Sequence, residues 1–180
     1  MEFTEKQISR EIKYQGKIVT VCLDRVELIN GLQTWREECL HPGGVAILPL
    51  LDNGDVICVR QHRYAYNKDL IEIPAGKLEP GEDPLSCGIR ELSEETGYEA
   101  REIIPLGVAY PSPGYVNEKL HLYLARGLKA GESHPDEGEF LEVFTMPFDK
   151  LLEKVMSDEI HDAKTVIATL KTKLILDKEG

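Results

Sequence analysis

The chain has 180 residues, 42% hydrophobic and 29% charged, which is the composition of a folded globular protein with one well-buried core and without room for two full domains. Its net charge of −11, with no cluster of Lys and Arg, argues against nucleic acid or an anionic membrane as a partner. No apolar run approaches a membrane span and the N-terminus lacks an apolar signal core, so we expect a cytoplasmic protein.

The first forty residues alternate in the manner of β-strands. The strand-like segments "KIVTVCLDRVELI" and "LQTWREECL" flank Asn30-Gly31, a dipeptide that is typical of a hairpin turn. The segment "HPGG" at 41–44 then breaks the alternation. We therefore expect an N-terminal β-meander subdomain at 1–42 and the main domain at 43–180.

A second hairpin is predicted where "VAILPLL" and "DVICVRQHRY" meet at Asp52-Asn53-Gly54, and "DLIEIPAG" reads as a further strand that enters the loop "KLEPGED". Helix signals follow at once. Asp83 is a good N-cap, Pro84 suits the first helical position and Gly97 suits the C-terminal stop, so the sequence predicts a helix over 84–96.

Strands also dominate the next part of the chain. "EIIPLGVAY" and "KLHLYLAR" are strand-like and are joined by the loop "PSPGYVN"; an acidic loop, "GLKAGESHPDEG", leads to the strand "EFLEVFTM". Helical patterns finish the chain near 148–157 and 162–176. Strands first, one central helix and terminal helices indicate an α/β (α+β) layered domain.

The central helix has two contrasting faces. At 100° per residue, the stripe that we expect to face the core is formed by Leu85, Ile89, Leu92 and Thr96. Three carboxylates share the other side near the helix C-terminus, where the macrodipole disfavours negative charge: Glu91, Glu94 and Glu95. Clustered carboxylate oxygens suit a hard divalent cation such as Mg²⁺ or Mn²⁺. The alternative is a solvated acidic face, which is the usual fate of helical glutamates.

The spacing around these acids resembles the Nudix box without a departure. It runs Gly76, five residues, Glu82, seven residues, Arg90-Glu91-Leu92, one residue, Glu94-Glu95, one residue, and Gly97-Tyr98. The chain thus looks like a Nudix hydrolase, a family that cleaves a nucleoside diphosphate linked to another moiety. The resemblance implies the Nudix fold, a mixed β-sheet in an α/β/α sandwich, here with an N-terminal antiparallel β-meander.

The same resemblance assigns roles within the box. Glu91, Glu94 and Glu95, together with the backbone carbonyl of Ala75, would coordinate two or three Mg²⁺ ions, with Mn²⁺ as an alternative. Glu91 and Glu95 would be the main ligands and would act in catalysis through a metal-activated water. The structural positions of the box would be Gly76, Glu82, Arg90 and Gly97, with Arg90 and Glu82 forming an ion pair that braces the loop and the helix.

The flanks resemble the ADP-ribose pyrophosphatase subfamily. Pro113 lies fifteen residues beyond Tyr98 in a Ser-Pro-Gly element, where the alternative reading is a simple turn. Trp35 would stack on adenine, the alternative being a core anchor, and Arg63 would bind phosphate, the alternative being a surface role. The general base would be Glu139, with Glu137 as the competing candidate in the same acidic loop and a merely solvated loop as the alternative.

One departure leaves base specificity open, because Arg36 follows the tryptophan where several relatives carry a glutamate. The implied function is Mg²⁺-dependent hydrolysis of ADP-ribose to AMP and ribose 5-phosphate, which makes the chain an ADP-ribose diphosphatase. Alternatives are the hydrolysis of another nucleoside diphosphate sugar, such as ADP-glucose or GDP-mannose, or a non-catalytic nucleotide-sensing module. A homodimer that exchanges contacts through the N-terminal sheets is also implied. The four scattered cysteines are interpreted as buried free thiols.

Overall fold

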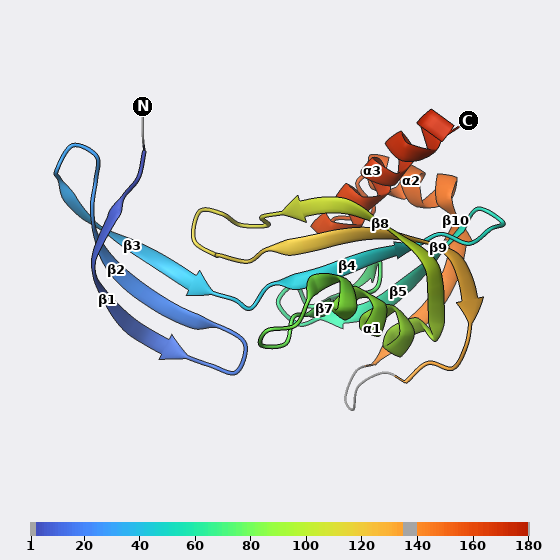
Figure 1. Cartoon of the computed structure of the whole chain (residues 1–180), viewed down its shortest axis with the longest axis horizontal. Coiled ribbons are helices and arrows are strands. Elements are labelled where there is room, and N and C mark those ends of the chain that lie inside the picture. Colours follow the sequence, from blue (N-terminus) through green and yellow to red (C-terminus); the bar gives the residue numbers. More distant parts are fainter. Residues whose placement is uncertain (1–2, 135–139, 180) are drawn as a thin grey trace. The chain divides into compact units, whose positions relative to one another are not determined.

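The computed structural model describes residues 3–134 and 140–179, which form two compact units. The meander unit consists of Met1–Gly43 with Tyr110–Lys119, and the core unit consists of Gly44–Ala109 with Leu120–Gly180. Each unit is described by itself. The chain follows a mixed α+β architecture, as predicted, with antiparallel and parallel strand pairs (Figure 1).

The meander unit is an antiparallel sheet in the order β1 (Lys6–Gln15), β2 (Thr20–Glu27) and β3 (Gln33–Leu40). The hairpin predicted at Asn30-Gly31 is confirmed, since Gly31 has a φ of 81° and its N–H donates to Leu28 O at 2.9 Å. Positive φ is the conformation that glycine adopts without steric cost, so the dipeptide fixes this turn.

Strand β1 is held to β2 by a buried carboxylate. Asp24 accepts hydrogen bonds from Arg10 Nε at 2.8 Å and Nη2 at 2.6 Å, and from Gln7 Nε2 at 2.8 Å. These bonds, the one from Arg10 foremost, hold the pKa of Asp24 below its ordinary value. The segment 110–119 joins the far end of β3, where Cys39 N–H donates to Tyr115 O at 2.7 Å.

The core unit contains two sheets. One has the order β7-β4-β9-β8, in which β4 is parallel to β9 and the other pairs are antiparallel; the other has the order β10-β5-β6 and is antiparallel. Their strands are β4 (Gly44–Pro49), β5 (Asp55–Arg63), β6 (Lys68–Glu72), β7 (Ala75–Lys77), β8 (Tyr98–Ala109), β9 (Leu120–Ala130) and β10 (Leu141–Pro147).

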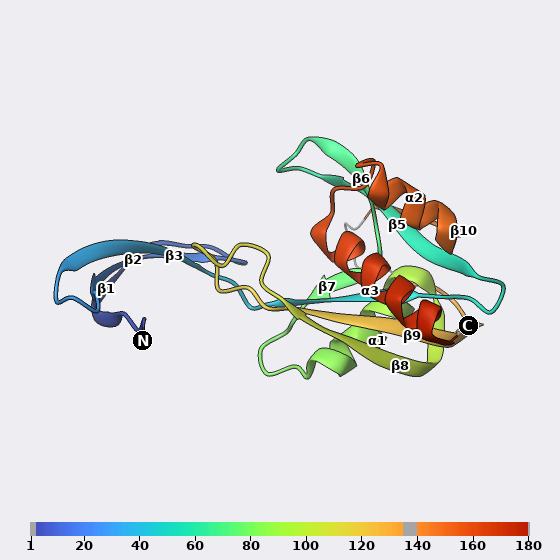
Figure 2. The same cartoon turned by 90° about the horizontal axis from the view of Figure 1, so that it is seen from above.

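Helices cover both faces of the four-stranded sheet. Helix α1 (Pro84–Thr96) packs on β4, β7 and β8, whereas α3 (Ala163–Glu179) contacts β4, β9 and β8, and α2 (Phe148–Met156) contacts α3, β10 and β5. Along β4, Ile47 joins the apolar cluster with Leu92 of α1, while Ala46 and Leu48 join the cluster beneath α2 and α3. Figure 1 shows α1 on one side of these strands and α3 on the other, and Figure 2 shows α3 lying across them.

The second predicted hairpin is wrong, although its turn exists. Gly54, with a φ of 87°, donates its N–H to Leu51 O at 2.9 Å, as a tight turn requires. However, β4 and β5 enter different sheets and meet only at an isolated bridge between Leu50 and Val56 among the described residues. The reason is that β4 already has β7 on one edge and β9 on the other, so no edge remains for β5.

The helix over 84–96 is confirmed, but its predicted core face is partly wrong. Leu85 and Ile89 are 40% and 48% exposed, and the buried residues are Cys87, Gly88, Leu92, Glu95 and Thr96. The missing side chain of Gly88 is the physical cause, because a Cβ there would lie 3.0 Å from Val45 Cγ1. The helix backbone therefore approaches β4 at Gly88, which rotates Leu85 and Ile89 outwards.

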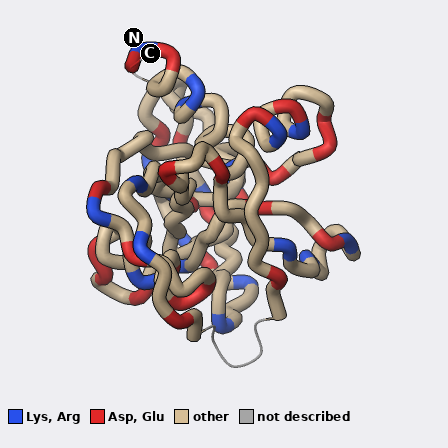
Figure 3. The backbone as a smooth tube through the Cα atoms, turned by 90° about the vertical axis from the view of Figure 1, so that its right-hand side faces the viewer, with Lys and Arg blue, Asp and Glu red and all other residues tan. Residues whose placement is uncertain are grey.

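Four further features match the sequence or add to it; they concern the terminal helices, the cysteines, the length of apolar helices and the distribution of charge. The terminal helices predicted near 148–157 and 162–176 are α2 and α3. All four cysteines are free thiols; Cys22, Cys58 and Cys87 are buried, and burial raises the pKa of Cys58 to about 12. None of the helices in residues 3–134 and 140–179 is long and apolar enough to span a membrane. Figure 3 shows Lys and Arg interspersed with Asp and Glu along the chain.

Candidate active site

The loop and helix after β7 have well-defined ends. Asp83 Oδ2 accepts a hydrogen bond from Ser86 N–H at 3.0 Å, and Pro84 occupies the first helical position. At the other end Gly97 has a φ of 74°, and its N–H donates to Ser93 O at 2.8 Å. These caps satisfy backbone groups that a helix leaves unpaired at its ends, so they fix where α1 begins and stops.

Gly76 and Glu91 are in direct contact. A Cβ atom built on Gly76 would lie 1.8 Å from Oε1 of Glu91 and 1.9 Å from its carboxyl carbon. No other residue type therefore fits at this position while the Glu91 carboxylate lies where it does. The contact brings a helix carboxylate onto the backbone of β7.

Glu95 reaches the same backbone. Its side chain is buried, with the residue only 2% exposed, and Oε2 accepts a hydrogen bond from Ala75 N–H at 3.3 Å. A buried carboxylate needs such partners, because an unpaired charge away from water is strongly unfavourable. The carboxylates of Glu91 and Glu95 thus both lie against the backbone of Ala75 and Gly76.

Arg90 contacts three carboxylates. It pairs with Glu82 through Nε at 3.0 Å and Nη2 at 3.2 Å, which is the bracing pair expected from the box, and its hydrogen bond holds the pKa of Glu82 at about 2. Its Nη1 also lies 2.8 Å from Glu91 Oε1 and 2.8 Å from Glu94 Oε2. Arg90 therefore offsets part of the repulsion among the clustered acids, a role that the sequence reasoning did not assign to it.

The donor set fits a hard divalent cation. Glu91, Glu94 and Glu95 carry the carboxylate oxygens that Mg²⁺ prefers, and the bare Gly76 leaves room for the Glu91 carboxylate. In the described residues, however, no three His, Cys, Asp or Glu side chains are arranged as a metal cage. Instead, the carboxylates of Glu91 and Glu94 both form ion pairs with Arg90.

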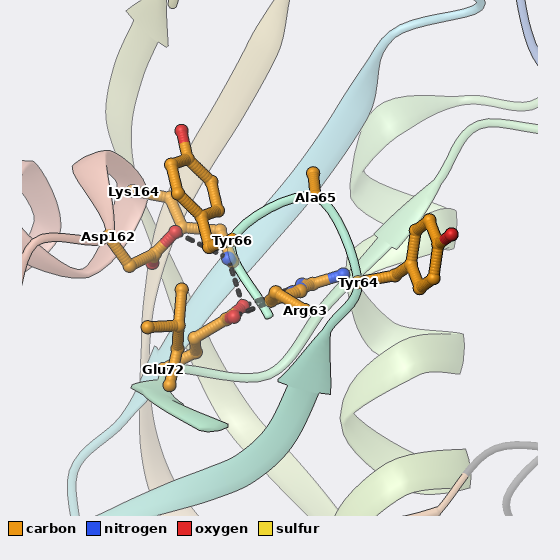
Figure 4. A pocket seen from close by; sticks show the side chains of 8 residues that line it. Arg63, Tyr64, Ala65, Tyr66, Glu72, Asp162 and Lys164 are labelled. Carbon is orange, nitrogen blue, oxygen red and sulfur yellow. Dashed lines mark hydrogen bonds and ion pairs between the residues drawn. The ribbon is translucent and has the colours of Figure 1, made fainter. Parts of the chain in front are cut away.

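A second polar cluster lies at the end of β5, where Arg63 was predicted to bind phosphate (Figure 4). Arg63 Nε and Nη2 each donate to an oxygen of Glu72 at 2.6 Å, and Lys164 Nζ of α3 donates to the same carboxylate. Burial opposes ionisation of Glu72, but the bonds from Arg63 and Lys164 outweigh it and hold its pKa below the ordinary value.

This cluster lines a cavity of about 380 Å³, together with Tyr64, Tyr66 and Asp162. Sequence reasoning missed Glu72, Asp162 and Lys164 as site residues. The available signal was a glutamate inside the apolar strand "DLIEIPAG", since a charge there needs a partner. Its partner Lys164 is 92 residues away along the chain, which no local pattern reveals.

The remaining predicted residues lie elsewhere. Trp35 is 54% exposed on β3, with the Arg25 guanidinium 5.8 Å from the ring centroid, so the alternative of a core anchor is wrong. Pro113 is exposed in the segment 110–119 of the meander unit, and Arg36 is paired with Glu5 at 2.7 Å. Glu139 and Glu137 lie outside the described residues.

Comparison with known proteins gives a family match, similar sequences and a similar structure. The NUDIX domain family matches residues 40–168. The chain is 42% identical over 168 residues to a methanol dehydrogenase activator of Bacillus methanolicus, covering 92% of this chain and 91% of the relative. It is also 42% identical over 166 residues to an ADP-ribose pyrophosphatase of Bacillus subtilis (strain 168), covering 91% and 90%. The crystal structure of an ADP compounds hydrolase matches with a TM-score of 0.88 over 100% of this chain and 98% of that one, at 22% identity, which supports the fold alone.

Proposed function

The chain belongs to the Nudix family, and from that premise we propose that it hydrolyses the pyrophosphate of ADP-ribose to AMP and ribose 5-phosphate. The observation that carries the proposal is the 42% identity to an ADP-ribose pyrophosphatase over 91% of this chain. The meeting of Glu91, Glu95 and the Ala75–Gly76 peptide supports the hydrolytic chemistry, because it gathers oxygen donors at one point.

We further propose Mg²⁺ as the cofactor, with Mn²⁺ as a substitute and two or three ions in the working enzyme. Glu91, Glu94, Glu95 and the Ala75 carbonyl would hold them. A divalent cation bound there supplies charge neutralisation at the pyrophosphate oxygens and makes nearby water acidic enough to attack phosphorus. Arg90 holds Glu82 and keeps α1 fixed against the loop that precedes it, so that the carboxylates keep their positions.

The proposed substrate contacts are made by Trp35, Arg63 and Pro113. Trp35 is 54% exposed and offers aromatic surface for adenine beside the Arg25 guanidinium, and Arg63 has a half-exposed guanidinium for phosphate. Pro113 is proposed as a third substrate contact. Glu139 is proposed as the general base, with Glu137 as the competitor. The segment that precedes them supports this, because His134 N–H donates to Glu94 O at 2.9 Å and so lies against α1.

Two other functions are considered. Hydrolysis of another nucleoside diphosphate sugar is a second candidate, because Arg36 stands after Trp35 where the resemblance implies a glutamate, and it is paired with Glu5. Activation of a methanol dehydrogenase is favoured by the equal 42% identity to an activator. A non-catalytic sensor has little need for Arg90 and all three box glutamates, so we do not favour it.

The test is a substrate panel of ADP-ribose, ADP-glucose, GDP-mannose, NADH and FAD with Mg²⁺, with products resolved by chromatography. We expect ADP-ribose among the best substrates and AMP with ribose 5-phosphate as products. A different best substrate would overturn the assignment, and binding of ADP-ribose without turnover would favour the sensor. Stimulation of a purified methanol dehydrogenase, assayed in parallel, tests the activator.

The site itself is tested by Glu95→Gln. This change keeps the shape of a buried side chain but removes its charge, so kcat should fall by about a thousandfold or more while the fold persists. Glu99→Gln is the matched control, because Glu99 is exposed on β8 just beyond the box. Near-normal activity of Glu95→Gln would contradict the metal assignment.

A further inference from the structure

Four charged side chains form a continuous network between the end of β5, the end of β6 and the start of α3 (Figure 4). Arg63 grips Glu72 through two bonds of 2.6 Å, Lys164 donates to Glu72, and Lys164 Nζ lies 2.8 Å from Asp162 Oδ1. The network therefore runs Arg63, Glu72, Lys164, Asp162, with alternating sign at each step.

Two members are buried, Asp162 is partly buried, and Arg63 reaches outwards. The side chains of Glu72, Lys164 and Asp162 are 1%, 10% and 15% exposed, whereas that of Arg63 is 40% exposed. Buried ion pairs add little stability over apolar residues of similar size, because removing charges from water offsets their attraction. Stability alone is thus a weak reason for this network, and the outward Arg63 indicates what it supports.

The geometry leaves Arg63 able to bind an anion. A guanidinium has five N–H donors, and Glu72 engages Nε and Nη2. Among the described residues, no hydrogen bond engages Nη1, so this edge faces a ligand in the cavity that Arg63 lines. Because a bidentate carboxylate fixes the plane of the guanidinium, this edge is held in one orientation before a ligand arrives.

The rear of the network is also fixed. Asp162 Oδ2 accepts from Thr165 N–H at 3.0 Å and from Thr165 Oγ1 at 2.6 Å, as the cap of α3, and Thr165 Oγ1 accepts from Ile73 N–H at 3.0 Å. Ile73 follows Glu72 directly in the chain. The start of α3 is therefore bonded to the same stretch of backbone that carries Glu72, so Lys164 has little freedom to move.

Charge decides what Lys164 contributes. With Lys164 present, the network is neutral, because its two cations balance the carboxylates of Glu72 and Asp162. Without Lys164, its net charge is −1 and Arg63 is the one cation of the network left to neutralise Glu72. We propose that Lys164 is a positioning residue that shares the charge of Glu72, and so leaves Arg63 with an attractive edge for the phosphate oxygens of a nucleoside diphosphate. This inference rests on the proposed function.

The test is K164M, which removes the charge and keeps a long apolar stem. We expect the KM for the best substrate of the panel to rise about tenfold, with kcat changed less than about twofold, because the ground-state attraction to phosphate is lost. K164R keeps the charge and should recover most of the affinity. K173M on the same helix is the matched control, since Lys173 is paired with Asp177 outside the network.

A second arm separates charge from folding and from the choice of substrate. K164M/D162N restores neutrality, and asparagine can still cap α3, so its KM should return towards the wild-type value. Binding of inorganic pyrophosphate by calorimetry should follow the same order, which tests the network even if no panel compound is hydrolysed. Unchanged KM and unchanged pyrophosphate binding in K164M, or equal losses in K164M and the double variant, would overturn the proposal. Failure of ADP-ribose in the panel with K164M still weakening pyrophosphate would overturn only the proposed function.

Discussion

Gly76 shows how one absent side chain supports the site. Glu91 lies on its backbone so closely that the first carbon of any side chain would overlap the carboxylate. The neighbouring Ala75 N–H binds Glu95, so the two glutamates lie against consecutive residues of β7. At the scale of single residues, the box glycine acts by making room for the carboxylate of Glu91.

Gly76→Ala should therefore impair catalysis more than folding. The added Cβ would lie 1.8 Å from Glu91 Oε1 and must displace the carboxylate by more than an ångström. Misplacement on that scale costs about a hundredfold in rate, so we expect kcat to fall by about that factor. Steady-state kinetics alongside circular dichroism measure both effects. A variant with wild-type kcat would show that the position of Glu91 is unimportant.

The Glu82–Arg90 pair makes stability depend on pH in a defined window. Its hydrogen bond holds the pKa of Glu82 at about 2, below the ordinary value of 4.5. The sign follows from the depressed value: the contribution is fully present above pH 4.5 and is lost as the pH falls towards 2. Denaturation midpoints of wild type and Glu82→Gln should differ at neutral pH and converge across this window. A constant difference down to pH 2 would speak against the pair.

At the scale of elements, the ends of α1 were predictable and its orientation was not. Asp83, Pro84 and Gly97 act through bonds to their near neighbours, so the sequence alone locates the helix. Which side faces the sheet depends on where the backbones approach most closely, which here is Gly88 against Val45, a contact between distant segments. A helical wheel weighs hydrophobicity and takes no account of such an approach, so it assigned Leu85 and Ile89 to the core.

Two leucines of α1 test the observed orientation. Leu92 is 1% exposed and packs with Ile47 and Ala125, whereas Leu85 is 40% exposed. Leu92→Ala should lower the free energy of unfolding by about 2–5 kcal/mol, because it removes buried contacts and leaves a cavity. Leu85→Ala on the same helix should lower it by less than about 1 kcal/mol. Urea denaturation of both variants decides the matter, and equal losses would favour the original helical-wheel assignment.

Two features could not be predicted because they depend on contacts between distant residues. They are the sheet that each strand joins and the network that links Arg63 to Glu72 and Lys164. The turn at Gly54 is local and was predicted, but the loss of pairing between β4 and β5 depends on β7 and β9 occupying both edges of β4. Likewise the Nudix spacing identified Glu91 and Glu95, since these residues are close in sequence. The link from Glu72 to Lys164 joins residues brought together only by the complete fold.

At the scale of the whole molecule, the meander unit exposes an unusual amount of apolar surface. Every residue of β1 is exposed, and the exposed large apolar side chains of this unit are Phe3, Ile8, Ile12, Tyr14, Ile18, Ile29, Leu32, Trp35, Tyr110 and Tyr115. Exposed apolar surface on a thin sheet favours association, and an antiparallel sheet of three strands has one face to cover. We therefore keep the prediction of a homodimer formed through this unit.

Substitution of Ile8 and Ile12 by glutamate tests the dimer. Both side chains are exposed, at 44% and 57%, so the monomer should tolerate the change. In a dimer formed through this sheet, each copy would bury two added negative charges, and the protein already carries a net charge of −11. Sedimentation equilibrium should give a dimer for the wild type and a monomer for the double variant. Leu174→Glu on α3, where the side chain is 62% exposed, is the control and should remain dimeric. A wild-type monomer at all concentrations would contradict the prediction, whereas an unaltered dimer in the double variant would move the interface away from β1.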